Sequence, residues 1–193
     1  IVRTIKEGLA TNKITKVYGI LNGTCNYILS QMEKTKDSFK NVLKNAQKLG
    51  YAEPGNPKLD LNGYDALAKV KILSALAFNC KISKSQSLME GIEKIEATDF
   101  DIVEKLNLRI KLLGITEIIN NKIFERVHPC LVSRDSYIGN VTDVMNAVIL
   151  EGKPVGESVM QGEGAGPGPT TSALMSDLLL SLIHISEPTR QHW

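Results

Sequence analysis

The chain has 193 residues, of which 42% are apolar and 23% are charged, a balance that is typical of one soluble globular domain. Its 23 basic and 21 acidic residues give a net charge of +2 and are spread along the sequence. We therefore expect no nucleic-acid partner, because such a partner needs a concentrated basic surface. No apolar run approaches the roughly 20 residues that span a bilayer, so we also expect no membrane partner.

Cysteine usage and the first residues bear on location and completeness. Cys25, Cys80 and Cys130 are odd in number and lie far apart, whereas zinc sites use close pairs. This pattern indicates reduced thiols, and we expect a cytoplasmic protein with no bound metal. The chain opens with IVRTIKEGLA, without a methionine or a signal peptide. We therefore expect that further residues precede Ile1.

The first part of the chain predicts a helix, a strand and a second helix. Apolar residues at helical spacing predict the first helix over residues 1–10, and β-branched residues in partial alternation predict the strand over residues 13–21. Tyr27, Ile28 and Met32 then line one face of the second helix. Residues with turn and cap chemistry precede this helix: Asn22, Gly23 and Thr24.

The next segment predicts two helices joined by a long loop. Asp37 and Ser38 are N-cap candidates for the first of them, and Gly50 ends it in the manner of a glycine just past a helix C-terminus. Residues 51–62 hold two prolines, a glycine and two asparagines, which exclude regular structure over most of this loop. A long helix is predicted from residue 63 to about residue 78.

The remainder of the chain predicts a sheet between shorter helices. A helix is expected near residues 99–106, and a glycine-rich loop, GEGAGPGPT, leads into another over residues 171–182. Segments rich in Ile, Val and Leu predict strands of one sheet: RIKLLGITEII, NKIFERVHPCLV and MNAVILEG. Residues 183–193 carry no recognisable pattern. The elements together predict a mixed α and β domain.

Asp65 and Lys69 lie four positions apart on the predicted long helix, so about one turn places them on the same face. An exposed ion pair of this spacing is the simplest interpretation, and it stabilises a helix by only about 0.3 to 0.5 kcal/mol. A lysine beside a carboxylate at the edge of an apolar helix could also act as a general acid or base. Spacing alone leaves both open. Glu53, in the preceding loop, is by itself best explained as a solvated turn residue.

Five sequence blocks occur here in the order in which homoserine dehydrogenases carry them: GILNGTCNYIL, LGYAEP, DLNGYDALAK, RVHPCLV and GEGAGPGPTTSALMSDL. The segment Leu49–Lys69 is the most specific of them. By this resemblance the chain is identified as the substrate-binding and catalytic domain of the family, over residues 1–182. The resemblance implies an α/β fold of the α+β kind, a mixed sheet with helices packed mainly on one face.

The family interconverts L-homoserine and L-aspartate 4-semialdehyde with NADP or NAD, in threonine and methionine biosynthesis. The resemblance implies that Lys69 is the proton donor and that Glu53 and Asp65 bind the substrate, whose ammonium group suits charged acceptors. It also implies that Gly50 and Gly166 lie against the cofactor, since a glycine lets the backbone approach a ligand closely. Hydride would pass between substrate and nicotinamide while Lys69 exchanges a proton with the substrate oxygen.

Several of these residues keep a structural alternative. Gly50 can simply end a helix, Gly166 can form a plain turn, and a helix cap explains Asn22 and its neighbours as well as a place at the site does. His128 has no second ligand at metal-binding spacing, so we expect a structural role for it. The loop sequence EPGNP carries one residue more than the family usually shows. It can bulge without moving Glu53, because insertions in surface loops cost little.

The family's dinucleotide fingerprint, G-x-G-x-x-G between a strand and a helix, is absent from this sequence. In the family it belongs to an N-terminal Rossmann domain. We therefore expect the chain on its own to bind cofactor poorly and to be inactive. The resemblance ends before SLIHISEPTRQHW, and we expect residues 183–193 to be a non-native tail.

Two other interpretations stay open. The sheet of this domain also forms the homodimer interface in the family, so the chain could be a truncated, non-catalytic dimerisation module. A different semialdehyde-handling dehydrogenase would need a nucleophilic cysteine, and none of the three cysteines stands in an activating context. The sequence does not discriminate between NAD and NADP.

Overall fold

The computed structural model describes residues 1–84 and 86–186 of the chain. Within these residues, strands form one sheet in the order β2-β4-β3-β1-β5-β6. Neighbouring strands are antiparallel except for β2 and β4, which run parallel, so the sheet is mixed. The strands are β1 (Lys13–Ile20), β2 (Leu88–Met89), β3 (Leu108–Ile119), β4 (Lys122–Ser133), β5 (Met145–Lys153) and β6 (Gly156–Glu163).

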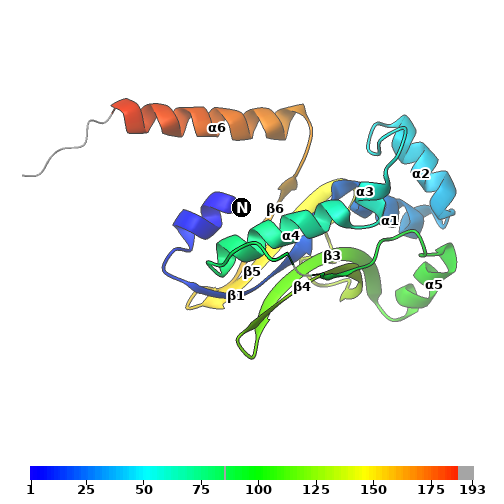
Figure 1. The fold of residues 1–193 in the computed structure, drawn as a ribbon. Helices are drawn as coiled ribbons and strands as arrows, with labels where there is room; N and C mark the ends of the chain where they lie inside the picture. The colour runs from blue at the N-terminus through cyan, green and yellow to red at the C-terminus, as the bar shows by residue number, and fades with distance from the viewer. Residues whose placement is uncertain (85, 187–193) are drawn as a thin grey trace, which may run out of the picture.

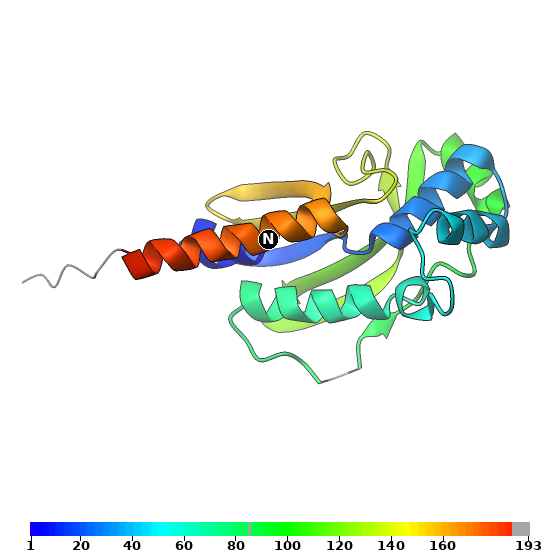
Figure 2. The ribbon, with the colours of Figure 1, turned by 90° about the horizontal axis from the view of Figure 1, so that it is seen from above.

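Helices cover mainly one face of this sheet (Figure 1). Of these, α1 contacts β3 and β5, while α4 contacts β1, β3 and β4. Seen from above, α4 runs along the sheet and α6 extends beyond its edge (Figure 2). The helical elements are a π-helical turn η1 (Thr4–Gly8), α1 (Gly23–Thr35), α2 (Phe39–Lys48), α3 (Lys58–Leu61), α4 (Tyr64–Ala77), α5 (Ala97–Lys105) and α6 (Pro167–Ser186).

The caps expected from the sequence set where α1 and α2 begin. The side chain of Asn22 accepts a hydrogen bond from the Cys25 amide at 2.9 Å, and Ser38 accepts one from the Asn41 amide at 3.4 Å. Caps of this kind satisfy an N–H that has no partner inside the helix, and each stabilises it by about 1 kcal/mol. Gly50 has a φ of +79° just beyond the end of α2, as expected of a glycine that terminates a helix.

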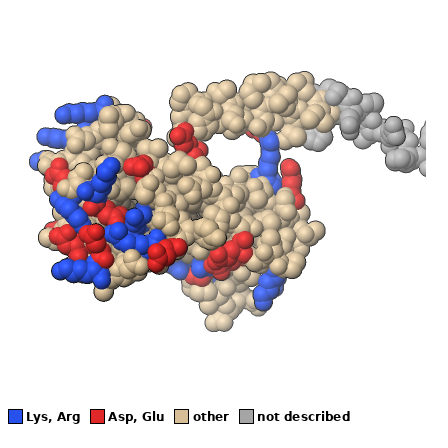
Figure 3. Space-filling model, turned by 180° about the vertical axis from the view of Figure 1, so that it is seen from behind, with Lys and Arg blue, Asp and Glu red and all other residues tan. Residues whose placement is uncertain are grey.

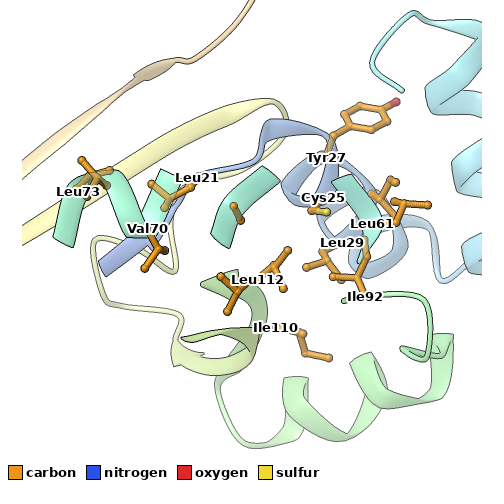
Figure 4. Close-up of a cluster of buried hydrophobic side chains, with 14 of the residues drawn as sticks. Leu21, Cys25, Tyr27, Leu29, Leu61, Val70, Leu73, Ile92, Ile110 and Leu112 are labelled. Atoms are coloured by element: carbon orange, nitrogen blue, oxygen red, sulfur yellow. The ribbon is translucent and has the colours of Figure 1, made fainter. Parts of the chain in front are cut away.

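The main hydrophobic core lies between the sheet and the helices (Figure 4). Leu112 of β3 belongs to it together with Leu29 of α1 and Val70 of α4, all of them at most 4% exposed. Burying a side chain of this size contributes about 1.5 to 3 kcal/mol. A smaller cluster covers the opposite face, where the connection from β4 to β5 supplies Ile138 and Val141. Central strand β3 is therefore buried on both faces.

The predicted fold class is confirmed, and so are the strands β1, β3, β4 and β5 and the helices α1, α2, α4 and α5. Other elements differ from the predictions, beginning with the helix expected over residues 1–10, where the structure has the π-helical turn η1. The short helix α3 interrupts the loop after α2, strand β6 was not predicted, and α6 begins at Pro167 rather than residue 171. The last helix also continues through residues 183–186, which were expected to belong to the tail. Residues 187–193 of that expected tail lie outside the described residues.

Helix α6 stands apart from the sheet, to which β6 connects it (Figures 1 and 2). An ion pair between Arg3 and Asp177 joins it to the N-terminal segment. Its leucines are largely exposed, for example Leu174 at 65%. Among the helices of the described ranges, none is long and apolar enough to cross a membrane. Charged side chains of both signs intermingle at the end of the molecule that carries α1, α2 and α5, and the middle of that face is largely uncharged (Figure 3).

Candidate active site

A pocket of about 590 Å³ opens where α1 and α4 begin. The first turn of α1, the loop after α2, α3 and α4 border it on one side, and the start of β5 and the segment after β6 border it on the other. Its lining residues are Leu21, Asn22, Gly23, Thr24, Leu49, Gly50, Tyr51, Asp60, Asp65, Lys69, Val144, Asn146, Glu163, Gly164, Ala165 and Gly166. Of the five residues to which the resemblance assigns a role, four lie here: Gly50, Asp65, Lys69 and Gly166.

Lys69 and Asp65 form the central polar pair of this pocket. The Lys69 ammonium donates to Oδ2 of Asp65 at 2.7 Å and to the Leu21 carbonyl at 3.0 Å. A lysine ammonium has three donors, so these two bonds leave one for a ligand. The Lys69 side chain is 49% exposed and that of Asp65 is 32% exposed, which places the pair at the pocket surface and within reach of a small molecule.

Asn22 links two of the carboxylates of the pocket, those of Asp60 and Asp65. Its Nδ2 donates to Asp60 at 2.8 Å and to Asp65 at 2.9 Å, while its Oδ1 caps α1 by accepting from the Cys25 amide. Asn22 is only 7% exposed, so this amide is a fixed part of the pocket floor. The same side chain therefore caps α1 and lines the pocket.

Asp60 is a pocket residue that the sequence analysis did not identify. It belongs to the four-residue helix α3, inside a segment predicted to be irregular, and its link to the site runs through Asn22, far away in the sequence. Together with Asp65 and Glu163 it gives the pocket three carboxylates against the single ammonium of Lys69. This excess of negative charge suits a ligand that brings a cation.

Cys25 lies beneath the pocket with no exposed surface, and its Sγ donates to the Asp60 carbonyl at 3.2 Å. Burial, reinforced by the charges of Asp60 and Asp65, raises the pKa of this thiol. A thiolate is the nucleophilic form of cysteine, so this environment suppresses the nucleophile that a semialdehyde dehydrogenase acting through a thioester would need.

Gly50 and Gly166 border the pocket with open backbone. Their φ angles are +79° and +105°, a region that other residue types rarely adopt, and a Cβ on Gly50 would meet no atom within 4 Å. Gly23 and Gly164 are of the opposite kind. A Cβ on Gly23 would lie 2.6 Å from the Val144 carbonyl, and one on Gly164 would collide with the Asn146 amide. The first two glycines leave room for a ligand, and the other two allow close packing of the wall.

Glu53 does not line the pocket in this structure. It is exposed, and its backbone carbonyl accepts a hydrogen bond from Gln47 of α2 at 2.9 Å. The same loop is anchored nearer the pocket, where Thr24 donates to the Tyr51 carbonyl at 2.7 Å. The loop therefore lies at the rim of the pocket, and the backbone carbonyl of Glu53 faces α2.

His128 lies on β4 beside Cys130, outside the pocket lining. Its Nδ1 is 2.9 Å from the Pro129 carbonyl and 3.4 Å from the Cys130 sulfur. Within the described ranges, no group of three His, Cys, Asp or Glu side chains is arranged to hold a metal ion. His128 therefore lies on the sheet, with its ring against neighbouring groups of the same strand.

Known proteins are similar to this chain in both sequence and fold. A family model described as homoserine dehydrogenase matches residues 1–179. The homoserine dehydrogenases of Helicobacter pylori and Neisseria gonorrhoeae are 46% and 45% identical over 179 residues, which is 93% of this chain and 42% and 41% of theirs. A crystal structure of a homoserine dehydrogenase from Thiobacillus denitrificans superimposes with a TM-score of 0.91 at 41% identity, covering 100% of this chain and 44% of that chain. The chain spans less than half the length of these relatives, and it belongs to the homoserine dehydrogenase family.

Proposed function

We propose that the chain is the substrate-binding and catalytic part of an NAD(P)-dependent oxidoreductase that interconverts L-homoserine and L-aspartate 4-semialdehyde. The observation that carries this proposal is the Lys69 and Asp65 pair, held in a pocket with excess negative charge and bordered by two open glycines. In the cell we place this reaction in the cytoplasm, in threonine and methionine biosynthesis.

The amino acid substrate brings an ammonium group, and the carboxylates of the pocket are suited to it. Asp65 contributes one acceptor and Asp60, bridged to it by Asn22, contributes another. Glu53 is proposed as a further carboxylate of the same binding site, acting from the rim loop. Lys69 exchanges the proton with the alcohol or aldehyde oxygen, using the donor that its bonds to Asp65 and Leu21 leave over.

The cofactor site is supported by Gly50 and Gly166. Both lie at the pocket with positive φ and with space where a side chain would otherwise stand, as a flat ring close to the backbone requires. The nicotinamide, when bound, accepts or supplies the hydride. The chain's own residues orient the substrate carbon and hold the proton at Lys69. Most of the dinucleotide would be bound by residues outside this chain, since the relatives are more than twice as long.

A chimera tests this proposal, made by replacing the 179 matched residues of the H. pylori enzyme with those of this chain. We expect NADPH oxidation with L-aspartate 4-semialdehyde, and we expect Lys69→Ala to lower kcat by about 10²- to 10⁴-fold with a smaller change in KM. Lys44→Ala, on the exposed surface of α2, is the control and should leave both constants unchanged. Unchanged turnover in Lys69→Ala would overturn the assignment of Lys69.

The alternative is a non-catalytic dimerisation module, which would use the sheet of this domain as its interface. We propose a homodimer for the catalytic form as well, so size alone does not separate the two. An inactive chimera that is nevertheless dimeric in analytical ultracentrifugation would favour the module, and turnover by the chimera would favour the enzyme.

A further inference from the structure

A buried polar stripe runs down the helix that begins at the pocket. Asn22, Asn26 and Ser30 recur every four residues on α1, so they share one face of the helix. All three are at most 9% exposed, although the helix packs against the hydrophobic core. Polar side chains are kept in such places only where their hydrogen bonds are made. Asn22 donates to the pocket carboxylates Asp60 and Asp65. The partners of Asn26 and Ser30 lie elsewhere.

Asn26 and Ser30 both bind the segment that connects β4 to β5. Nδ2 of Asn26 donates to the carbonyls of Val141 and Met145 at 3.2 and 3.1 Å. The hydroxyl of Ser30 accepts from the Asp143 amide at 3.2 Å. These bonds fix residues 141–144, which precede the β5 ladder, together with Met145 at its start. Within this stretch Asp143 adopts a φ of +55°.

Lys111 completes this arrangement from the central strand β3. It is 1% exposed, and its ammonium donates to Oδ1 of Asn26 at 3.0 Å and to the Val141 carbonyl at 2.5 Å. A buried ammonium is costly, and an apolar side chain would fill the same volume without that cost. One acceptor belongs to Asn26, which binds the β4–β5 segment, and the other belongs to Val141 of that segment. The polar contacts therefore point to anchoring rather than to packing.

The anchored segment leads directly into the pocket wall. Val144 and Asn146 line the pocket, and the Val144 carbonyl lies so close to α1 that only a glycine fits at position 23. A small displacement of the segment would therefore disturb the first turn of α1, where Asn22 holds the two carboxylates.

We propose that Lys111 is a positioning residue of the pocket. Directly at the Val141 carbonyl and indirectly through Asn26, it holds residues 141–146 in place, so that Val144 and Asn146 keep their position in the wall. Lys111 touches no pocket ligand itself. The effect on the segment is independent of the proposed function, and the effect on substrate binding rests on it.

Hydrogen exchange on the chain as it stands tests the first effect. In Lys111→Met, which keeps an unbranched side chain one atom shorter and removes the donors, we expect the Asp143 and Met145 amides to exchange about tenfold faster or more, with the β1 to β3 ladder unchanged. Thr116→Val is the matched control. Thr116 lies on the same strand, is also 1% exposed, and donates only to Ser74, away from the segment. Equal protection of residues 141–146 in wild type and Lys111→Met would overturn the proposal.

Kinetics in the chimera test the second effect. We expect Lys111→Met to raise KM for L-aspartate 4-semialdehyde by about tenfold and to change kcat by less than about threefold, because Lys69 is not displaced. Thr116→Val should change neither. If exchange in the segment rises but KM stays constant, the segment does not position the wall and the proposal fails. An inactive wild-type chimera would instead count against the proposed function, and the exchange result would still decide whether Lys111 holds the segment.

Asn26→Asp asks the same question if Lys111→Met is too unstable to purify. The carboxylate still accepts from Lys111 but cannot donate to Val141 and Met145. We expect the same local increase in exchange at residues 141–146, with the charge of Lys111 now fully paired. Unchanged exchange in this variant would contradict the proposed route through Asn26.

Discussion

Lys69 and Lys111 are the same residue type in opposite surroundings. Lys69 is half exposed and paired with a carboxylate, whereas Lys111 is buried and is met by an amide oxygen and a backbone carbonyl. Neutral acceptors do not compensate a buried charge as a carboxylate does. Burial, aided by the charge of Arg109 and opposed by Glu33 and Asp143, lowers the pKa of Lys111 from 10.5 to about 8.

This shift predicts a pH dependence of stability. Between pH 8 and 10.5 Lys111 is protonated in the unfolded chain and neutral in the folded chain. The free energy of unfolding therefore increases as pH rises through this range. Below pH 8 the penalty for burying the charge is fully present. Between pH 7 and pH 11, the free energy of unfolding of the wild type should rise by about 3 kcal/mol relative to that of Lys111→Met, at roughly 1.4 kcal/mol per pKa unit.

Urea denaturation of both proteins across this range measures the gain. The comparison between the two cancels the titration of the other lysines and of the tyrosines. A difference that stays constant from pH 7 to pH 11 would show that the ammonium of Lys111 is not desolvated in the folded chain.

The residues of the site were predictable to different degrees. Asp65 and Lys69 meet because their spacing on a helix dictates it, and Gly50 and Gly166 have the positive φ angles that glycine allows. Asp60 was missed because its place depends on Asn22, a contact across 38 positions that no local pattern encodes. The position of Glu53 depends on how a proline-rich loop is tethered to α2, which spacing alone does not determine.

At the scale of the elements, the corner between α3 and α4 packs against the segment that follows β2. A Cβ on Gly91 would collide with the Leu61 carbonyl, which is also the acceptor of the Ile92 amide at 3.0 Å. We therefore expect Gly91→Ala to lower the free energy of unfolding by about 1 to 3 kcal/mol. Gly55→Ala is the matched control, because a Cβ there meets no atom within 4 Å.

Urea denaturation distinguishes these two variants. Gly55→Ala should be neutral or should stabilise by up to about 1 kcal/mol, since alanine restricts the unfolded chain. Equal stability of the two variants would mean that the backbone near Gly91 can shift to accommodate a Cβ, and that the close approach to Leu61 does not contribute to stability.

Strand β6 and the start of α6 were not predicted, each for a physical reason. Strand β6 is an edge strand with alternating partial exposure, so its glutamates and glycines hid the pattern that buried strands show. Helix α6 carries prolines at positions 167 and 169, in its first turn, where the amides need no partner within the helix. The buried strands β3 and β5 were recognisable because continuous burial selects long runs of Ile, Val and Leu.

At the scale of the whole molecule, the pocket holds the proposed substrate and proton-transfer residues Asp65 and Lys69 together with two proposed cofactor contacts. Gly50 and Gly166 are the only proposed cofactor contacts in the part of the chain that the structure describes, and the sequence holds no G-x-G-x-x-G fingerprint. We expect the chain alone to show no saturable NADPH binding below about 1 mM in a fluorescence titration, because two glycines supply little binding energy.

The H. pylori chimera is the positive control for this titration and should bind NADPH in the micromolar range. Tight saturable binding to the chain alone would contradict the division of the site between this chain and the remaining length of its relatives.

Cys25 gives the molecule an internal reporter. Its sulfur is bonded to the carbonyl of Asp60 and is closed off by the pocket floor, while Cys80 and Cys130 are partly exposed. A thiol reagent added to the folded chain would therefore label the latter two first and reach Cys25 only when α1 and α3 part. The rate of that third labelling event would time the opening of the pocket floor, with no engineered probe.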